Sequence, residues 1–220
     1  LLQHGCPVCG GAVEDTWVLE RGVRPECGVK GRSPFQKEKN IFKSLAAFFE
    51  EKVGRKPWSL QKFWLARIAL GDSFAILAPP GLGKTTFGLV VASWFARTGK
   101  SYVVLPTQAL VKQACGVLSS WGQDYLSYIS SEKNSDVKRR IEEGDFNLLV
   151  TTSNFLLRNF DLLHGKFFDF IFVDDVDAIL KRSKNVEKIL RLLGFKKVKQ
   201  RWLGKAKGCL LYTSPSPRDR

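Results

Sequence analysis

Short apolar runs alternate with longer amphipathic stretches through most of this chain, and the alternation restricts the folds it can adopt. Neighbouring parallel strands need a crossover connection, and strands covered on both faces are apolar throughout. The pattern therefore predicts an α/β fold, with a parallel sheet and helices on both faces. The expected strands are Phe74–Ala78, Tyr102–Leu105, Tyr125–Ile129, Leu148–Thr151 and Phe168–Val173, and helices are expected near 35–51, 59–70, 84–97, 108–120, 135–143 and 153–160.

The composition is that of a globular protein with a polyanionic partner. Hydrophobic residues make up 44% of the 220 residues, which supports a buried core and excludes global disorder. No stretch approaches the roughly 20 apolar residues of a membrane span, and no apolar leader opens the chain. The net charge of +14 favours nucleic acid as a partner. The segment Lys181–Lys207 contributes +10, from eleven basic residues and one acid, although a solvated helical face would also suit such a run. The helical spacing of Val186, Ile189, Leu190 and Leu193 predicts that one side packs inward, with Lys184, Lys188 and Arg191 pointing outward.

A glycine-rich stretch follows the first expected strand and opens a helix. In this position it is a phosphate-binding loop, of the form that helicases use. Its glycines let backbone amides turn toward the phosphates of a nucleotide, and the amino terminus of the next helix adds positive potential. We expect Lys84 to reach the β- and γ-phosphates of ATP and Thr85 to ligate Mg²⁺. The loop residues are Ala78, Pro79, Pro80, Gly81, Leu82, Gly83, Lys84, Thr85 and Thr86.

Acidic residues follow the last expected strand, in the sequence Asp174-Asp175-Val176-Asp177. Alone, such a string is typical of a solvated turn. Beside a phosphate-binding loop, it lies at the sheet edge where α/β folds bind ligands. We expect Asp174 to hold Mg²⁺ through water, and Asp175 to polarise the attacking water. Lys84, Asp174 and Asp175 are therefore the predicted catalytic residues.

Three further segments favour a nucleic-acid motor. Pro106 and Thr107 follow one strand and Thr151 and Thr152 end another, so their hydroxyls could contact successive backbone phosphates. Helix capping is the simpler explanation for each threonine taken alone. Upstream, Gln61 could bond both a donor and an acceptor on adenine, with a nearby aromatic ring stacked on the base.

The first 32 residues form a separate glycine-rich unit with metal-ligand spacing. Cys6 and Cys9, separated by two residues, could ligate one zinc ion, with Cys27 as a third ligand. Arg24 stands where the fourth cysteine is expected, and His4 is a conceivable substitute. The alternative is a knuckle that folds without metal. We expect a zinc-finger-like module at 1–32, followed by a P-loop domain at 33–208.

Both ends of the chain indicate a piece of a longer protein. The sequence contains no Met, and it opens without a start residue. Residues 209–220 resemble a transposon-adapter sequence from DNA library preparation, translated in one frame, although a flexible Ser/Pro-rich terminus is the alternative. We treat residues 209–220 as a sequencing-adapter artefact.

The motifs between residues 55 and 180 resemble the first RecA-like domain of superfamily-2 helicases. The order of parts is similar to the amino-terminal end of the reverse gyrase family, in which a zinc finger precedes a helicase-like module and a type IA topoisomerase. Most related helicases have Glu where Asp175 stands, so Asp174-Asp175-Val176-Asp177 is the specific indicator. Lys184-Asn185-Val186 and Leu192-Leu193-Gly194-Phe195 continue the likeness.

The resemblance implies an ATP-dependent DNA topoisomerase that introduces positive supercoils in the cytoplasm of a thermophile. Its cofactors would be ATP, Mg²⁺ and Zn²⁺, and its partner would be DNA. We expect no membrane association and a monomeric protein. The second RecA-like domain and the topoisomerase domain are not in this sequence, so the piece alone would have little activity. The alternatives are a superfamily-2 DNA or RNA helicase with a zinc knuckle, and a nucleic-acid-binding module that does not hydrolyse ATP.

Overall fold

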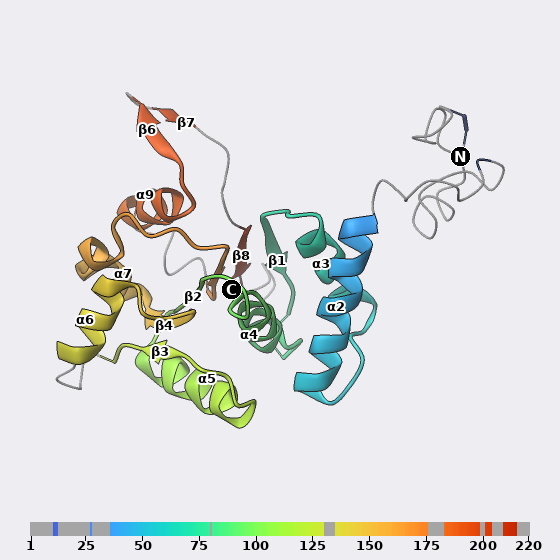
Figure 1. Cartoon of the computed structure of the whole chain (residues 1–220), viewed down its shortest axis with the longest axis horizontal. Helices are drawn as coiled ribbons and strands as arrows, with labels where there is room; N and C mark the ends of the chain where they lie inside the picture. The colour runs from blue at the N-terminus through green and yellow to red at the C-terminus, as the bar shows by residue number, and fades with distance from the viewer. Residues whose placement is uncertain are drawn as a thin grey trace.

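A six-stranded sheet, in which every pairing is parallel, forms the centre of the molecule (Figure 1). The computed structural model describes residues 11–12, 27, 36–79, 81–129, 135–175, 183–198, 201–203 and 209–214. The strand order is β1-β8-β5-β2-β4-β3. The strands are β1 (Phe74–Leu77), β2 (Ser101–Leu105), β3 (Leu126–Ser127), β4 (Leu148–Thr152), β5 (Phe170–Val173) and β8 (Cys209–Ser214).

Helices cover both faces of this sheet because its central strands are apolar on both sides. Val103, Phe170 and Phe172 face one helical layer, whereas Tyr102 and Ile171 face the other, as the twofold alternation of a strand requires. The predicted α/β fold is confirmed. The first layer holds α2 (Gln36–Val53), α3 (Ser59–Ala69), α4 (Lys84–Phe95) and α5 (Gln108–Ser120), and the second holds α6 (Ser135–Glu143), α7 (Ser153–Arg158), the 3₁₀ turn η2 (Phe160–Leu163) and α9 (Ser183–Leu192).

Residues 209–214 form a strand of the sheet, beyond the domain boundary expected at residue 208. β8 lies between β1 and β5, with Leu211 paired to Phe74 on one side and to Phe172 on the other. Leu211 is fully buried, because this central position takes a strand that is apolar on both faces. An apolar run fills such a position whatever its origin, so the adapter origin of residues 209–220 stays a prediction.

The basic segment has a folded amino-terminal part. It comprises α9 and an antiparallel pair, β6 (Lys196–Val198) with β7 (Arg201–Leu203), which projects from the body of the molecule (Figure 1). Ile189 and Leu193 are buried, as the helical spacing predicts. The expectation that Lys188 points outward is wrong. Its ammonium group donates hydrogen bonds to the backbone carbonyls of Leu156 and Leu157, so this lysine caps the end of α7.

The predicted zinc module lies largely outside the described residues. Cys6, Cys9 and Arg24 are not described, and Cys27 is half-buried. Among the residues that are described, no group of three His, Cys, Asp or Glu side chains could hold a metal ion. Within the same ranges, no helix is long and apolar enough to cross a membrane.

Candidate nucleotide-binding site

The glycine-rich loop joins the end of β1 to the start of α4. Gly81 and Gly83 both adopt positive φ angles, of 80° and 74°, a conformation that side chains with a Cβ disfavour. Gly83 caps α4, which begins at Lys84, so the unpaired amides of the first helical turn face the loop. Leu82 is partly buried and packs against the hydrophobic core, and this contact anchors the loop. Ala78 is buried, Pro79 is exposed, Thr86 is half-buried and Pro80 lies outside the described residues.

The side chain of Lys84 lies against the loop itself. Its ammonium group donates hydrogen bonds to the carbonyl oxygens of Ala78 and, at 2.9 Å, Pro79. The fixed positive charge is therefore at the mouth of the loop, where the β- and γ-phosphates of a nucleotide bind in proteins with this motif.

Thr85 and Asp174 meet although they are far apart in sequence. The Thr85 hydroxyl donates a 2.6 Å hydrogen bond to Oδ2 of Asp174, and the Asp175 amide donates one of 3.2 Å to Oδ1. The Asp174 amide in turn donates to the carbonyl of Val104 in β2, at 2.9 Å, which extends the pairing of β5. One hydroxyl and one carboxylate are thus oriented together. Both are oxygen ligands that suit Mg²⁺.

Asp175 has a left-handed backbone conformation. Its φ angle is +53°, the one positive value among non-glycine residues in the described parts of the chain. Asp tolerates this left-handed region better than most residues, and backbone strain of this kind concentrates at functional sites. The turn carries Asp175 out of the strand direction directly after Asp174. Val176 and Asp177 lie outside the described residues.

Gln61 lies beside the loop from its position on α3. Its side-chain amide nitrogen is 3.7 Å from the place that a Cβ on Gly83 would occupy, and its carbonyl accepts from the Trp58 amide at 3.3 Å. Trp58, whose backbone amide makes that hydrogen bond, is 44% exposed, so its ring is a candidate for stacking on a base. The sequence indicated Gln61 but did not single out which ring would accompany it.

The four residues predicted to contact nucleic acid have different environments. Pro106 is half-buried, and Thr107 is exposed and caps α5, where it accepts from the Leu110 amide at 3.3 Å. Thr152 caps α7 in the same way, accepting from the Phe155 amide at 3.2 Å. The capping explanation therefore holds for both threonines.

Thr151 is not available to a nucleic acid, in contrast to the prediction. Its side chain is fully buried, and its hydroxyl forms a 2.8 Å hydrogen bond with the phenol of Tyr102. Position 151 faces the second helical layer, together with Leu149, because alternate residues of β4 face the same side of the sheet. Sequence spacing alone did not separate Thr151 from Thr152.

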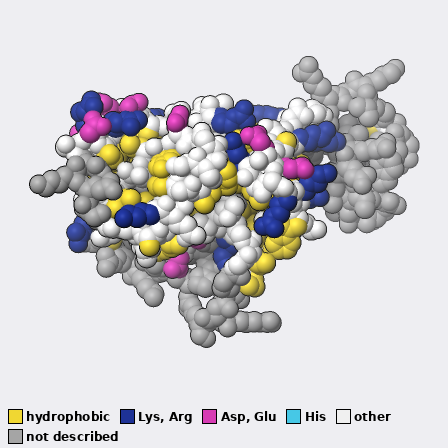
Figure 2. Space-filling model, turned by 90° about the horizontal axis from the view of Figure 1, so that it is seen from below, with side chains coloured by type: hydrophobic (Ala, Val, Ile, Leu, Met, Phe, Trp, Pro, Cys, Tyr) yellow, Lys and Arg dark blue, Asp and Glu magenta, His cyan; other side chains and the backbone are white. Residues whose placement is uncertain are grey.

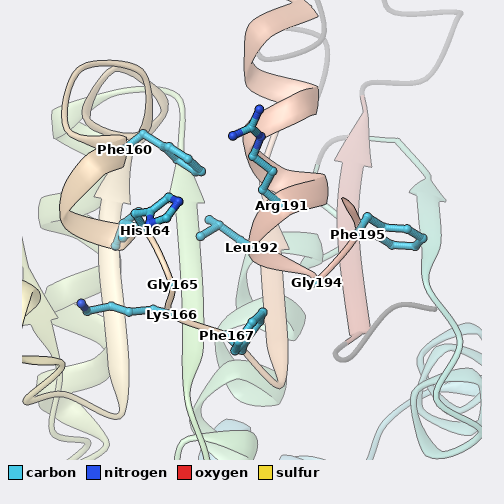
Figure 3. Close-up of a pocket in the computed structure, with 10 residues that line it drawn as sticks. Phe160, His164, Gly165, Lys166, Phe167, Arg191, Leu192, Gly194 and Phe195 are labelled. Atoms are coloured by element: carbon cyan, nitrogen blue, oxygen red, sulfur yellow. The ribbon is translucent and has the colours of Figure 1, made fainter. Parts of the chain in front are cut away.

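A pocket of about 570 Å³ lies away from these residues, at the opposite edge of the sheet. Figure 3 shows it between the turn that carries Phe160 and His164 and the end of α9, with Arg191 and Leu192. The turn precedes β5, whereas Asp174 follows it, so the pocket and the phosphate-binding loop lie at opposite ends of that strand. This hollow therefore takes no part in the nucleotide site. Its lining is Phe160, Leu163, His164, Gly165, Lys166, Phe167, Arg191, Leu192, Gly194 and Phe195.

The RecA-like sheet, the phosphate-binding loop and the acidic residues after β5 define the nucleotide-binding core of a P-loop helicase. The chain belongs to the DEAD/DEAH box helicase family, whose sequence pattern matches residues 58–211. Family membership implies ATP and Mg²⁺ as cofactors, and the oxygen ligands and lysine described above fit them.

Within that family, the chain is homologous to reverse gyrases. It is 44% identical to reverse gyrase 1 of Aquifex aeolicus over 210 residues, which cover 86% of this chain and 18% of that protein. It is 35% identical to the reverse gyrase of Thermococcus kodakarensis over 231 residues, covering 89% of this chain and 14% of that protein. The chain thus spans less than a fifth of the length of these relatives.

The fold is also that of a solved DEAD box protein. A crystal structure of a DEAD box protein from the hyperthermophile Methanococcus jannaschii superposes with a TM-score of 0.56 at 20% identity, covering 79% of this chain and 48% of that one. At this identity the likeness concerns the fold alone.

Proposed function

We propose that this chain is the ATP-binding and ATP-hydrolysing helicase part of a reverse gyrase, which uses ATP to introduce positive supercoils into DNA. The observation that carries the proposal is the 2.6 Å hydrogen bond between Thr85 and Asp174. It brings the end of the phosphate-binding loop to the carboxylate that follows β5, and these two groups hold Mg²⁺ in P-loop enzymes. The 44% identity to a reverse gyrase supports the finer assignment.

Each side chain then has one task. Lys84 neutralises charge on the β- and γ-phosphates, and Gly81 and Gly83 let the backbone amides approach them. Thr85, and Asp174 through water, would hold Mg²⁺, which would draw charge from the phosphate oxygens when bound. Asp175 orients and polarises the attacking water. Gln61 recognises the edge of adenine, and the exposed Trp58 ring stacks on the base.

Replacement of Lys84 by Ala tests the hydrolytic assignment. In the full-length gene product, we expect Lys84→Ala to abolish DNA-stimulated ATP hydrolysis, because the cation beside the γ-phosphate is removed. Lys62→Ala is the matched control, since it removes an exposed lysine on α3. Retained turnover in Lys84→Ala would refute the active-site assignment. Absence of turnover in the unmutated protein would favour a binding module that does not hydrolyse ATP.

We further propose that DNA contacts the edge formed by Pro106, Thr107 and Thr152, and that the basic segment Lys181–Lys207 supplies positive charge to the interaction. On the face shown in Figure 2, Lys and Arg side chains are dispersed and acidic side chains lie among them. Among the ion pairs of the described residues, Arg139 on α6 pairs with Asp136 at 2.7 Å and with Glu143 at 3.2 Å. No continuous basic surface is visible among the described residues of that face. The basic segment, with a net charge of +10, is our candidate for the charge that DNA requires.

Neutralisation of the β6–β7 pair tests this DNA interaction. We expect replacement of Lys196, Lys197 and Arg201 by Gln to weaken binding equally on all sequences. The logarithmic salt slope should flatten by roughly 0.9 for every DNA phosphate that the protein no longer neutralises. Arg139→Gln serves as the control, because Arg139 is already paired with two carboxylates. An unchanged affinity and salt slope would mean that the segment is a solvated face.

We propose a structural zinc site in residues 1–32, with Cys6, Cys9 and Cys27 as ligands. The two-residue spacing of the first pair supports it, since two such thiolates fit one tetrahedral ion.

For residues 209–220 we propose an adapter origin. DNA read across codons 200–220 from an unamplified template tests it, and an unchanged sequence would contradict it.

A further inference from the structure

Helix α4 lies antiparallel across strand β5, and three pairs of residues meet along this crossing. At one end, the Thr85 hydroxyl binds the carboxylate of Asp174. At the other end, the rings of Phe95 and Phe170 stack with centroids 5.2 Å apart and planes 2° from parallel. Between them, Gly88 lies against the ring of Phe172.

The periodicities of a helix and a strand explain why these pairs coincide. Thr85, Gly88 and Phe95 share one face of α4, because spacings of three and seven residues return to the same side of a helix. Their partners, at positions 170, 172 and 174, are alternate residues on one side of β5. The helix advances roughly 15 Å over ten residues and the strand roughly 13 Å over four, so the two elements stay in step.

The approach is closest at Gly88. A Cβ at this position would lie 2.4 Å from the Cζ atom of Phe172 and 2.5 Å from its two Cε atoms. These separations are about 1 Å short of ordinary van der Waals contact. Phe172 is fully buried, and close-packed interiors leave such a ring little room to move.

We propose that Gly88 is a positioning residue for the magnesium site: the missing side chain sets the depth at which α4 packs on β5, and thereby lets Thr85 reach Asp174. The proposal rests on the nucleotide site proposed above. A side chain at position 88 displaces α4 outward from β5 by about 1 Å. The distance between the Thr85 hydroxyl, one helical turn earlier, and the Asp174 carboxylate increases with it. The 2.6 Å bond then reaches the limit of hydrogen-bonding distance, so hydroxyl and carboxylate no longer bind one ion together.

The test substitutes Gly88 by Ala and measures ATP hydrolysis against Mg²⁺ concentration in the full-length gene product. We expect a reduction of kcat by about 100-fold, the order that a 1 Å misplacement costs, together with a higher Mg²⁺ concentration at half-maximal rate. Gly116→Ala is the matched control. Gly116 is also a helical glycine, on α5, but a Cβ there would have nothing within 4 Å.

A compensating substitution separates positioning from general damage. Phe172→Leu removes the Cε and Cζ atoms that a side chain at position 88 would meet. We expect Gly88→Ala with Phe172→Leu to recover the Mg²⁺ dependence that Gly88→Ala loses, although the smaller side chain lowers the melting temperature. If Gly88→Ala does not fold, the double variant still reports on the site. Wild-type Mg²⁺ dependence in a folded Gly88→Ala protein would overturn the proposal, as would a double variant that folds but is no better than Gly88→Ala.

A crystal structure of the Gly88→Ala protein provides a readout independent of activity. We expect the distance from Thr85 Oγ1 to Asp174 Oδ2 to exceed 3.5 Å, and an unchanged 2.6 Å would overturn the proposal. If the unmutated protein hydrolyses no ATP, the proposed function fails. The distance measured in the Gly88→Ala protein still decides the role of Gly88.

Discussion

The phenol of Tyr102 and the hydroxyl of Thr151 form a 2.8 Å hydrogen bond between the buried strands β2 and β4. Both side chains are fully buried, and Tyr102 also stacks on Phe168 with ring centroids 5.2 Å apart. The bond lies just below the edge where Thr107 and Thr152 begin their helices. It therefore holds together the two strands that carry the proposed DNA contacts.

Removal of either partner should destabilise the fold, to different extents. Thr151 also donates to the carbonyl of Thr152 at 3.3 Å, so Tyr102→Phe leaves the threonine hydroxyl with a partner. We expect this variant to lose about 1 kcal/mol of unfolding free energy. Thr151→Val leaves the phenol buried without an acceptor and should cost about 1–3 kcal/mol. Urea unfolding measures both, and equal losses would contradict this asymmetry.

Tyr102 should also make the fold sensitive to alkaline pH. Burial raises the pKa of this phenol far above its ordinary value of 10.0, and the hydrogen bond with Thr151 offsets only part of the rise. Above about pH 10, the unfolded chain loses this proton while the folded chain keeps it, so stability falls as pH increases. The contribution of the group is fully present below that pH. We expect the free energy of unfolding to fall by about 1.4 kcal/mol per pH unit from this residue.

Tyr102→Phe isolates that contribution, because it removes this titration and leaves the other tyrosines in place. Urea unfolding between pH 9 and pH 11 should show a shallower loss of stability in Tyr102→Phe than in the unmutated protein. Parallel pH profiles for the two proteins would mean that the Tyr102 phenol ionises equally easily in the folded and unfolded states.

Thr85→Val should separate magnesium binding from nucleotide binding. The substitution keeps the side-chain shape but removes the hydroxyl that meets Asp174. We expect the concentration of Mg²⁺ at half-maximal ATP hydrolysis to rise at least tenfold, which is equivalent to about 1.4 kcal/mol of binding free energy. Thr98→Val, at an exposed position after α4, is the control and should behave as the unmutated protein. A Thr85→Val protein with normal Mg²⁺ dependence would show that the hydroxyl is not a ligand.

Two substitutions of Asp175 should distinguish its chemistry from its backbone strain. Asn tolerates the left-handed conformation as Asp does, so Asp175→Asn should abolish ATP hydrolysis with little change in melting temperature. Gly adopts a φ angle of +53° without strain, so Asp175→Gly should also be inactive but more stable, by about 1 kcal/mol. Calorimetry and an ATPase assay measure the two properties. Full activity in Asp175→Asn would exclude the carboxylate as the group that polarises water.

Arg24→Cys should complete the proposed zinc site. Four thiolates close the tetrahedron that Cys6, Cys9 and Cys27 leave open, so we expect zinc content to rise towards one ion per chain. Metal analysis of the two proteins, purified identically, measures the change. Equal zinc content would show that residue 24 does not occupy a ligand position.

Much of the fold and the nucleotide site follows from local sequence. Glycines such as Gly81 and Gly83 let backbone approach phosphates, and the short apolar run before Asp174 predicts a buried strand. Strand and helix periodicity then brings the loop and the acidic residues to the same edge of the sheet, because all the strands run in parallel. These are relationships of spacing along the chain, which is why the sequence was sufficient to predict them.

Contacts between distant elements were decided by tertiary packing alone. The sequence marked Thr151 and Thr152 alike, but the twofold alternation of β4 buries one hydroxyl against Tyr102 and leaves the other at the edge. Lys188 belongs to a run of positive charge, yet it points inward, because the carbonyls at the end of α7 lie within reach of its ammonium group. Gly88 resembles any other helical glycine until the ring of Phe172 is set against it. Tyr102 and Thr151, like Lys188 and Leu157, are more than 30 residues apart in sequence. Contacts between such distant residues, and the face of a strand that becomes buried, are determined only when the sheet is assembled.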